Sequence, residues 1–289
     1  MAGYCLGSWL FPPLVPRAVT LRGLALLAAV LTTLAACSPG ERHTGEDAAQ
    51  TTAHHGTTTS DKRSEVTRAR GGGTTTSGPR LRWDYVALGD SLAAGVGARR
   101  GYVARYAEHL RSDTGVRLRV INLGQSGQTS SQLLHALRND PAMREALRGA
   151  EVVTLNIGLN DLGQAGSSYE SGTCGGPQNE ACLRGAVKRV ERNWHAIIEE
   201  ITSLRTEDRT IIRTVGLGYI PRARGVFGRY LGKVTRDIAS AAAESGIPYA
   251  EVHLGSEGMS ADGLHPNDRG YDVIADRLDE LGYDPLAPR

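Results

Sequence analysis

The sequence has little excess charge of either sign and no dense block of basic residues. Its 33 Lys and Arg side chains nearly balance its 31 Asp and Glu side chains, which leaves a net charge of +2. Proteins that bind nucleic acid through its phosphates concentrate Lys and Arg on one surface or in one segment. We therefore expect no nucleic-acid partner for this chain.

The sequence also lacks an apolar run that would span a bilayer comfortably. The run Leu24–Ala36 follows two arginines and has the proportions of a signal peptide. It closes with Leu34-Ala-Ala-Cys37, which resembles the bacterial lipobox, where cleavage precedes a cysteine that is then acylated. The alternative is an ordinary secretory signal with a chance cysteine. We predict a lipoprotein signal peptide over residues 1–36 and a protein exported and anchored through Cys37 to the outer face of the bacterial membrane.

Large apolar residues are almost absent from Ser38 to Arg80, a stretch rich in Thr, Gly and Ser. Such a segment cannot bury enough apolar surface to offset the conformational entropy lost on ordering. We predict a disordered tether over residues 37–80, followed by one domain over residues 81–289. The adjacent His54 and His55 lie in this tether, where a solvated pair is expected rather than a metal site.

Cysteines are few, with only four in the chain. Cys5 precedes the predicted cleavage site and Cys37 would carry lipid, which leaves Cys174 and Cys182. In an exported protein two remaining cysteines form a disulfide by default. A zinc site would need further ligands, and Thr173–Leu183 contains no histidine. We predict a Cys174–Cys182 disulfide.

Strand-like and helix-like segments alternate from Trp83 onward, and no internal repeat is evident. The expected strands are Arg82–Leu88, Val116–Leu123, Glu151–Ile157, Thr210–Val215 and Ile247–Val252. The expected helices are Tyr102–Ser112, Ser130–Arg138, Pro141–Leu147, Leu183–Leu204, Arg229–Ser245 and Asp268–Leu281. Between them we expect a polar loop at Gly163–Glu180 and a glycine-rich loop at Gly216–Gly232. The alternation predicts an α/β domain in which helices cover both faces of a parallel sheet.

Small and polar residues follow the first three expected strands. They are Gly89-Asp-Ser91, Asn122-Leu-Gly124 and Gly158-Leu-Asn160. The carboxyl ends of parallel strands converge on one edge of the sheet, where open α/β folds bind their ligands. Ser91, in a tight turn at this edge, is well placed to be a nucleophile if a base, an orienting acid and oxyanion donors lie nearby.

The segment Asp262-Gly-Leu-His265 before the last helix supplies a base and an acid. Imidazole as a side-chain type titrates near neutral pH, so the ring of His265 can accept the Ser91 proton and return it to a leaving group. Asp262 can reach the other ring nitrogen and fix the tautomer. The Gly124 N–H, the Asn160 amide and the Ser91 N–H are the candidate oxyanion donors.

Asp90 and Asp161 invite a different interpretation, a metal-dependent phosphoesterase that also uses Asp262 and His265. Clusters of oxygen ligands need several converging carboxylates, and the glycines would then have no explanation. We expect Asp90 and Asp161 to hold loops through backbone hydrogen bonds. No metal or other cofactor is expected.

Four short blocks resemble those of the SGNH, or GDSL, hydrolases and occur in that family's order. They are Gly89-Asp-Ser-Leu92, Gly124 with its neighbours, Gly158-Leu-Asn-Asp161 and Asp262-Gly-Leu-His265. The resemblance implies a flavodoxin-like three-layer α/β/α sandwich with a five-stranded parallel sheet, and ester hydrolysis without a metal. It implies that Ser91 is the nucleophile, that Gly124 and Asn160 form the oxyanion hole with Ser91, and that Asp262 and His265 complete the triad.

The resemblance does not fix the substrate, because family members cleave lipid, aryl and acetylated-glycan esters. We expect a secreted, lipid-anchored serine esterase or lipase that acts as a monomer. The alternatives are an acyltransferase or carbohydrate O-acetylesterase with the same site, and a surface lipoprotein that binds without turnover. The loop Gly216–Gly232 is expected either to line an acyl pocket or to be a solvated loop with its apolar residues in the core.

Overall fold

The computed structural model describes residues 81–205, 210–218, 220 and 224–286. The chain separates into two units, Met1–Arg70 and Gly71–Arg289, and every described residue belongs to the second. The predicted signal peptide, Cys37 and the predicted tether therefore lie outside the described residues. In the part of the chain that is described, no helix is both long enough and apolar enough to cross a membrane.

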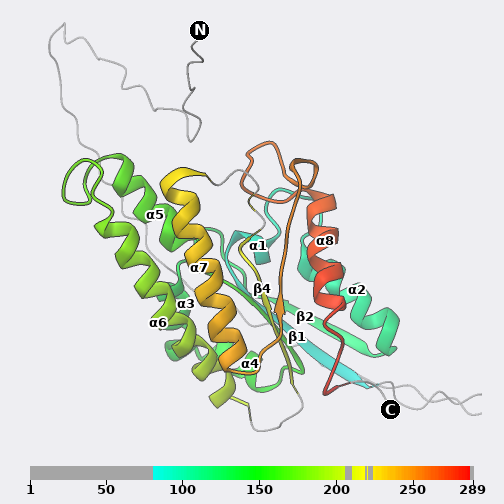
Figure 1. Ribbon diagram of the computed structural model, residues 1–289. Coiled ribbons are helices and arrows are strands. Elements are labelled where there is room, and N and C mark those ends of the chain that lie inside the picture. Colours follow the sequence, from blue (N-terminus) through cyan, green and yellow to red (C-terminus); the bar gives the residue numbers. More distant parts are fainter. Residues whose placement is uncertain (1–80, 206–209, 219, 221–223, 287–289) are drawn as a thin grey trace, which may run out of the picture. The chain divides into compact units, whose positions relative to one another are not determined.

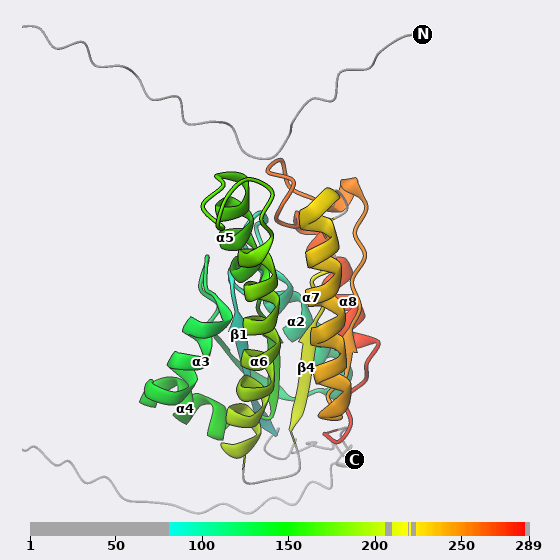
Figure 2. The ribbon, with the colours of Figure 1, turned by 60° about the vertical axis from the view of Figure 1, so that its left-hand side comes forward.

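Five parallel strands form the middle layer of the fold (Figures 1 and 2). They are β1 (Arg82–Gly89), β2 (Arg117–Asn122), β3 (Val152–Asn156), β4 (Ile211–Val215) and β5 (Tyr249–Ala250). Their order across the sheet is β2-β1-β3-β4-β5. In this flavodoxin-like order the connections reverse direction between β1 and β3, and ligands bind outside the carboxyl ends of the strands at that point.

Helices cover both faces of the sheet. They are α1 (Ser91–Ala94), α2 (Tyr102–Thr114), α3 (Ser130–Asn139), α4 (Pro141–Arg148), α5 (Leu159–Glu170), α6 (Ala181–Ser203), α7 (Gly225–Glu244) and α8 (Asp268–Asp279), with a short 3₁₀ turn η1 (Ser256–Gly258). On one face α2 packs against α8, and on the other α6 packs against α3, α5 and α7 (Figure 2). The predicted three-layer α/β/α arrangement is confirmed.

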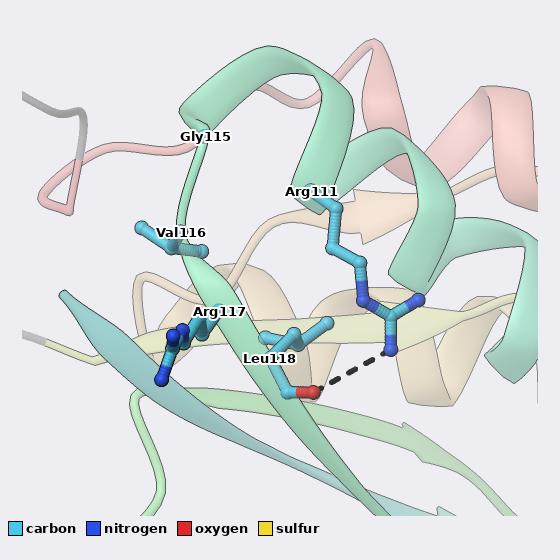
Figure 3. Close-up of a pocket in the computed structure, with 5 residues that line it drawn as sticks. All are labelled: Arg111, Gly115, Val116, Arg117 and Leu118. Atoms are coloured by element: carbon cyan, nitrogen blue, oxygen red, sulfur yellow. Dashed lines mark hydrogen bonds between the residues drawn. The ribbon is translucent and has the colours of Figure 1, made fainter. Parts of the chain in front are cut away.

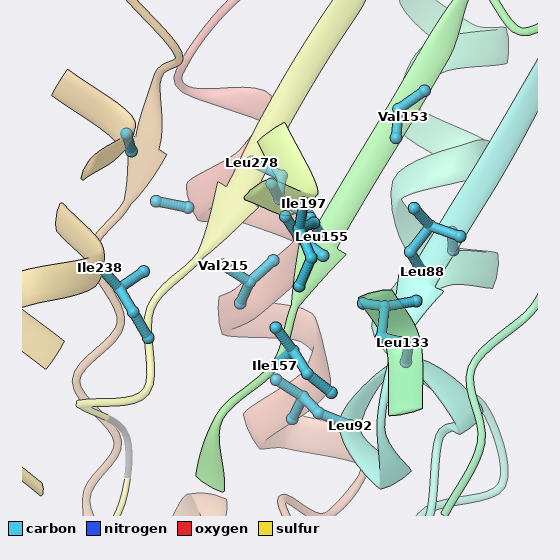
Figure 4. Packing of buried hydrophobic residues seen from close by; sticks show 14 of the residues in the cluster. Leu88, Leu92, Leu133, Val153, Leu155, Ile157, Ile197, Val215, Ile238 and Leu278 are labelled. Carbon is cyan, nitrogen blue, oxygen red and sulfur yellow. The ribbon is translucent and has the colours of Figure 1, made fainter. Parts of the chain in front are cut away.

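The sequence of the central strands reflects this double cover. Every residue of β3 is buried, whereas the edge strand β2 is partly exposed. Parallel strands covered on both faces are largely apolar, and β3 (Val-Val-Thr-Leu-Asn) departs from this only at Thr154 and Asn156. Figure 4 shows part of the core that results, with Leu88 of β1, Leu155 of β3 and Val215 of β4 among residues from helices on both faces.

The segment after β3 differs from the sequence-based prediction. The polar loop expected at Gly163–Glu180 begins only after Glu170, because α5 covers Leu159–Glu170. Glycine and serine disfavour a helix interior, which is why the segment reads as a loop. Burial of Leu159, Leu162 and Ala165 on one side of α5 outweighs that preference, since packing of an apolar face supplies most helical stability in proteins.

Helix α7 also begins earlier than predicted, at Gly225 rather than Arg229, so the second half of the expected loop at Gly216–Gly232 is helical. Phe227 in its first turns packs against Gly166 of α5, where an added Cβ would lie 3.3 Å from the Phe227 ring. Strand β5 is shorter than the predicted Ile247–Val252. The other predicted elements differ from the structure mainly at their ends, and α1 and η1 were not predicted.

The Cys174–Cys182 disulfide is present, with the Cα atoms 5.3 Å apart. It closes the loop between α5 and α6, as predicted. Glu180, inside this closed loop, accepts hydrogen bonds from Arg229 at 2.8 Å and from the Tyr230 hydroxyl at 2.7 Å. The disulfide-closed loop is thereby joined to the first turns of α7.

Candidate active site

Ser91 is the first residue of α1 and follows β1 directly through Asp90. Asp90 caps this short helix, since its Oδ1 accepts the Leu92 N–H at 3.0 Å. Ser91 itself is 8% exposed, at the carboxyl end of the sheet. The strand, the capped turn and the helix therefore fix the backbone on both sides of the Ser91 hydroxyl.

Ser91, His265 and Asp262 form a continuous chain of hydrogen bonds. His265 Nε2 lies 2.9 Å from Ser91 Oγ, and His265 Nδ1 lies 2.6 Å from Asp262 Oδ2. An ionised carboxylate can only accept, so the proton between Asp262 and His265 belongs to Nδ1. In the neutral ring Nε2 is then the acceptor for the Ser91 hydroxyl.

A small hairpin before α8 carries both Asp262 and His265. Met259 pairs with Pro266 in an antiparallel bridge, and the Ser260 N–H donates to the His265 carbonyl at 2.8 Å. Asn267 closes the base of the hairpin, because its side-chain amide donates to the carbonyls of Glu257 and Met259. The same Asn267 caps α8, so the position of His265 is tied to the helix that follows it.

The hairpin approaches the segment after α1 so closely that Gly97 must lack a side chain. Gly97 has a φ of +95°, and an added Cβ would lie 2.8 Å from His265 Cβ and 2.6 Å from the Pro266 carbonyl oxygen. Both the backbone conformation and the contact require glycine. This contact places the imidazole within reach of Ser91.

The carboxyl of Asp262 is held in its ionised form. Partial burial raises its pKa, but hydrogen bonds from the His265 ring, the Ser260 hydroxyl and the N–H groups of His265 and Leu264 bring the pKa well below its usual range. Asp262 therefore carries a negative charge beside His265 at neutral pH.

Asn160 lies in the first turn of α5 rather than in a loop, and it faces the same edge as Ser91. Its Nδ2 donates to the Gln128 carbonyl at 2.9 Å and lies 3.4 Å from Asp90 Oδ2. The second contact is long for a hydrogen bond. One N–H of the Asn160 amide is therefore only weakly held in this structure.

Gly124 packs directly on the turn that carries Ser91. An added Cβ would lie 2.6 Å from the Ala94 nitrogen, so only glycine fits. Its own N–H donates to Asn122 Oδ1 at 3.0 Å, while Asn122 Nδ2 donates to the Ala93 carbonyl at 2.7 Å. Asn122 thus joins the end of β2 to α1, and the Gly124 N–H already has an acceptor.

Buried polar side chains from β1, α2 and β3 form hydrogen bonds within the sheet that reach Asp90, next to Ser91. The Tyr85 hydroxyl lies 2.9 Å from Thr154 Oγ1, the Tyr102 hydroxyl donates to Asn156 Oδ1 at 3.2 Å, and Asn156 Nδ2 donates to Asp90 Oδ1 at 2.7 Å. Burial raises the pKa of Asp90 to about 6, although hydrogen bonds from Leu92 and Asn156 and the nearby His265 oppose the rise. Asp90 is thus a carboxyl whose charge is costly in this position.

Asp161 has the predicted structural role. Its carboxylate is 1% exposed and accepts the Ser130 N–H at 2.7 Å and the Ser130 hydroxyl at 2.8 Å, at the start of α3. Together with the Asp90–Leu92 bond, this confirms that both aspartates hold loops through backbone hydrogen bonds. In the described part of the chain no three His, Cys, Asp or Glu side chains converge as metal ligands would.

A cavity of about 620 Å³ lies elsewhere, between the end of α2 and the start of β2 (Figure 3). It is lined by Arg111 and residues 115–118. The start of β2 is the end of the sheet opposite to Ser91, because all strands run parallel. This cavity is therefore not part of the candidate site.

Three polar residues at the site were given no role from the sequence. Asn156 is the last residue of the buried strand β3, Asn122 precedes Gly124, and Ser260 precedes Asp262. A polar residue at the end of a buried strand was the available signal for Asn156. For Ser260 the signal was its position next but one to Asp262, whereas no local pattern indicates that Asn122 bonds to Ala93.

The fold and the hydrogen-bonded serine, histidine and aspartate together define the class of α/β serine hydrolases. The chain belongs to the GDSL-like lipase/acylhydrolase family, whose family model matches residues 87–273, more than half of the chain. The expected family and enzyme class are confirmed, and the chain is an ester hydrolase of the SGNH type.

Individual relatives agree with this assignment. The chain is 27% identical over 212 residues to the spore germination lipase LipC of Bacillus licheniformis, covering 70% of this chain and 97% of LipC. Among solved structures, the lipase Lip_vut3 from a goat rumen metagenome has a TM-score of 0.64 and 27% identity, covering 71% of this chain and 99% of that lipase. The acetylxylan esterase Axe2 of Geobacillus stearothermophilus, at 20% identity and a TM-score of 0.54 over 73% of this chain and 98% of its own, shares the fold.

The raised pKa of Asp90 predicts that the free energy of unfolding depends on pH. The pKa of the Asp90 carboxyl is about 6 in the folded protein, above its ordinary value of 3.8. Because the pKa is higher in the folded protein, the protonated carboxyl contributes its full stabilisation below the pKa of the unfolded chain. That stabilisation is lost as the pH rises through the pKa of the folded protein. Between pH 4 and pH 7, the free energy of unfolding of the natural protein should fall by roughly 2 kcal/mol relative to Asp90→Asn, which cannot ionise. Urea denaturation across this range measures the difference, and a difference independent of pH would contradict the prediction.

Proposed function

We propose that this chain is an exported, lipid-anchored serine esterase or lipase that hydrolyses carboxylic esters through Ser91, His265 and Asp262. The observation that carries the proposal is the continuous hydrogen-bonded chain from Ser91 Oγ to Asp262 Oδ2 at the switch point of the sheet. Membership of an ester-hydrolase family supports the choice of an ester as the substrate.

The geometry suits acyl transfer in two steps. Ser91 Oγ attacks the ester carbonyl carbon while its proton moves to His265 Nε2, and Asp262 stabilises the resulting imidazolium. The tetrahedral intermediate collapses when His265 returns the proton to the departing alcohol, which leaves an acyl group on Ser91. A water molecule, deprotonated by His265, then attacks the acyl group and restores the free serine.

The developing oxyanion requires donors at the same edge. The Ser91 N–H, at the first position of α1, has no acceptor within its own helix. The weakly held N–H of Asn160 lies at the same edge, and we assign it as the second donor. The Gly124 N–H would be the third, provided that it exchanges its bond to Asn122 Oδ1 for one to the oxyanion.

The nucleophile and base are tested by covalent labelling and turnover. A fluorophosphonate should label the natural protein and not Ser91→Ala. His265→Ala should lower turnover of a p-nitrophenyl ester by about 10⁴- to 10⁶-fold, the range seen when a triad member is removed. Equal labelling of Ser91→Ala and the natural protein would exclude Ser91 as the nucleophile.

The oxyanion assignment is tested by Asn160→Ala. Loss of one donor should lower kcat by roughly 100- to 1000-fold while the fold is retained. Steady-state kinetics on the same ester, with circular dichroism of both proteins, measures the two properties. Unchanged kcat in a folded Asn160→Ala protein would remove Asn160 from the oxyanion hole.

The anchor is proposed from the sequence Leu34-Ala-Ala-Cys37 alone. Cys37→Ser should abolish incorporation of a labelled fatty acid when the protein is produced in a bacterium, because serine cannot be modified as the lipobox cysteine is. Cys5→Ser serves as the matched control and should still incorporate the label. Label retained in Cys37→Ser would contradict lipidation at this residue.

A further inference from the structure

Ser260 lies beside the Asp–His pair in the hairpin before α8. Its hydroxyl donates to Asp262 Oδ1 at 2.6 Å, a short bond of the kind formed between a hydroxyl and a carboxylate. Within the described residues, Ser260 and His265 are the two side chains that hydrogen-bond to Asp262. Ser260 is therefore in direct contact with the acid that orients His265.

The two oxygens of Asp262 are used differently. Oδ1 accepts the Ser260 hydroxyl and the N–H groups of Leu264 and His265, both at 2.9 Å. Oδ2 accepts His265 Nδ1 at 2.6 Å. Rotation of the carboxylate would break the bonds to Oδ1 as well as the bond to the ring, so the donors on Oδ1 keep Oδ2 directed at the imidazole.

The hydrogen bonds on Oδ1 are important because the carboxylate of Asp262 is accessible to water. The side chain of Asp262 is 48% exposed, so water competes for both of its oxygens. The N–H groups of Leu264 and His265 are held in place by the backbone turn. The third donor to Oδ1 is a side chain, the Ser260 hydroxyl.

Ser260 is itself held in place from several sides. Its N–H donates to the His265 carbonyl at 2.8 Å, and its carbonyl accepts the Gly263 N–H at 3.0 Å. Its Oγ lies 3.3 Å from the position that a Cβ on Gly97 would occupy. The hydroxyl is thus placed between the segment that follows Ser91 and the carboxylate of Asp262.

We propose that Ser260 is a positioning residue, which keeps Asp262 Oδ2 on His265 Nδ1 and thereby keeps Nε2 facing Ser91. This inference rests on the proposed function. Small misplacements of a catalytic group are costly, since about 1 Å can lower a rate by roughly 100-fold. Because two backbone donors remain on Oδ1, loss of the Ser260 hydroxyl should lower kcat by roughly tenfold, with little change in KM.

The test compares Ser260→Ala with Ser256→Ala, since Ser256 precedes the same hairpin and is not among the side chains that hydrogen-bond to Asp262. Turnover of a p-nitrophenyl ester gives kcat and KM, and proton NMR gives the low-field resonance of the His265 Nδ1 proton. Ser260→Ala should lose most of its kcat and show a broadened or shifted resonance. Ser256→Ala should match the natural protein in both measurements.

Two further variants decide the matter if Ser260→Ala folds poorly. Thr and Val have nearly the same shape, but only Thr carries a hydroxyl. Ser260→Thr should therefore have a higher kcat than Ser260→Val, and it should keep the His265 Nδ1 proton resonance. Equal kcat in these two variants, or unchanged kcat or resonance in a folded Ser260→Ala protein, would overturn the proposal. If Ser91→Ala is inactive while Ser260→Ala equals the natural protein, only this inference fails. If Ser91→Ala keeps full turnover, the proposed function fails as well.

Discussion

The hydrogen bond between Ser91 and His265 is the contact on which the site depends, and it joins residues 174 positions apart in the chain. It forms because two independent pieces of structure meet at the carboxyl edge of the sheet. One is the capped turn after β1, and the other is the hairpin before α8. Gly97 allows them to touch, since any side chain there would occupy the space of His265.

Beneath this contact the protein buries polar groups where a parallel sheet would ordinarily be apolar. Thr154 and Asn156 of β3, with the hydroxyls of Tyr85 and Tyr102, lead to the carboxyl of Asp90. Buried polar groups are costly unless they are paired, and here each is paired with another. The arrangement holds the turn of Ser91 to the centre of the sheet at the expense of a buried carboxyl with a raised pKa.

Ester hydrolysis and the attachment to a membrane are supported by different parts of the chain. Family membership and the lipase relatives establish ester hydrolysis. The proposed lipid anchor and the proposed export rest on the N-terminal sequence alone, because residues 1–80 lie outside the described residues.

The sequence by itself determined the alternation of strands and helices, the disulfide partners and the four blocks that carry Ser91, Gly124, Asn160 and His265. These are local signals, because periodicity, turn residues and short motifs are contained in a few consecutive positions. Only the tertiary structure decided that Leu159–Glu170 is a helix, since the burial of its apolar side outweighs its glycines and serines. It also decided the partners of Asn122 and Asn156, because each of those hydrogen bonds depends on where another segment of the chain is packed.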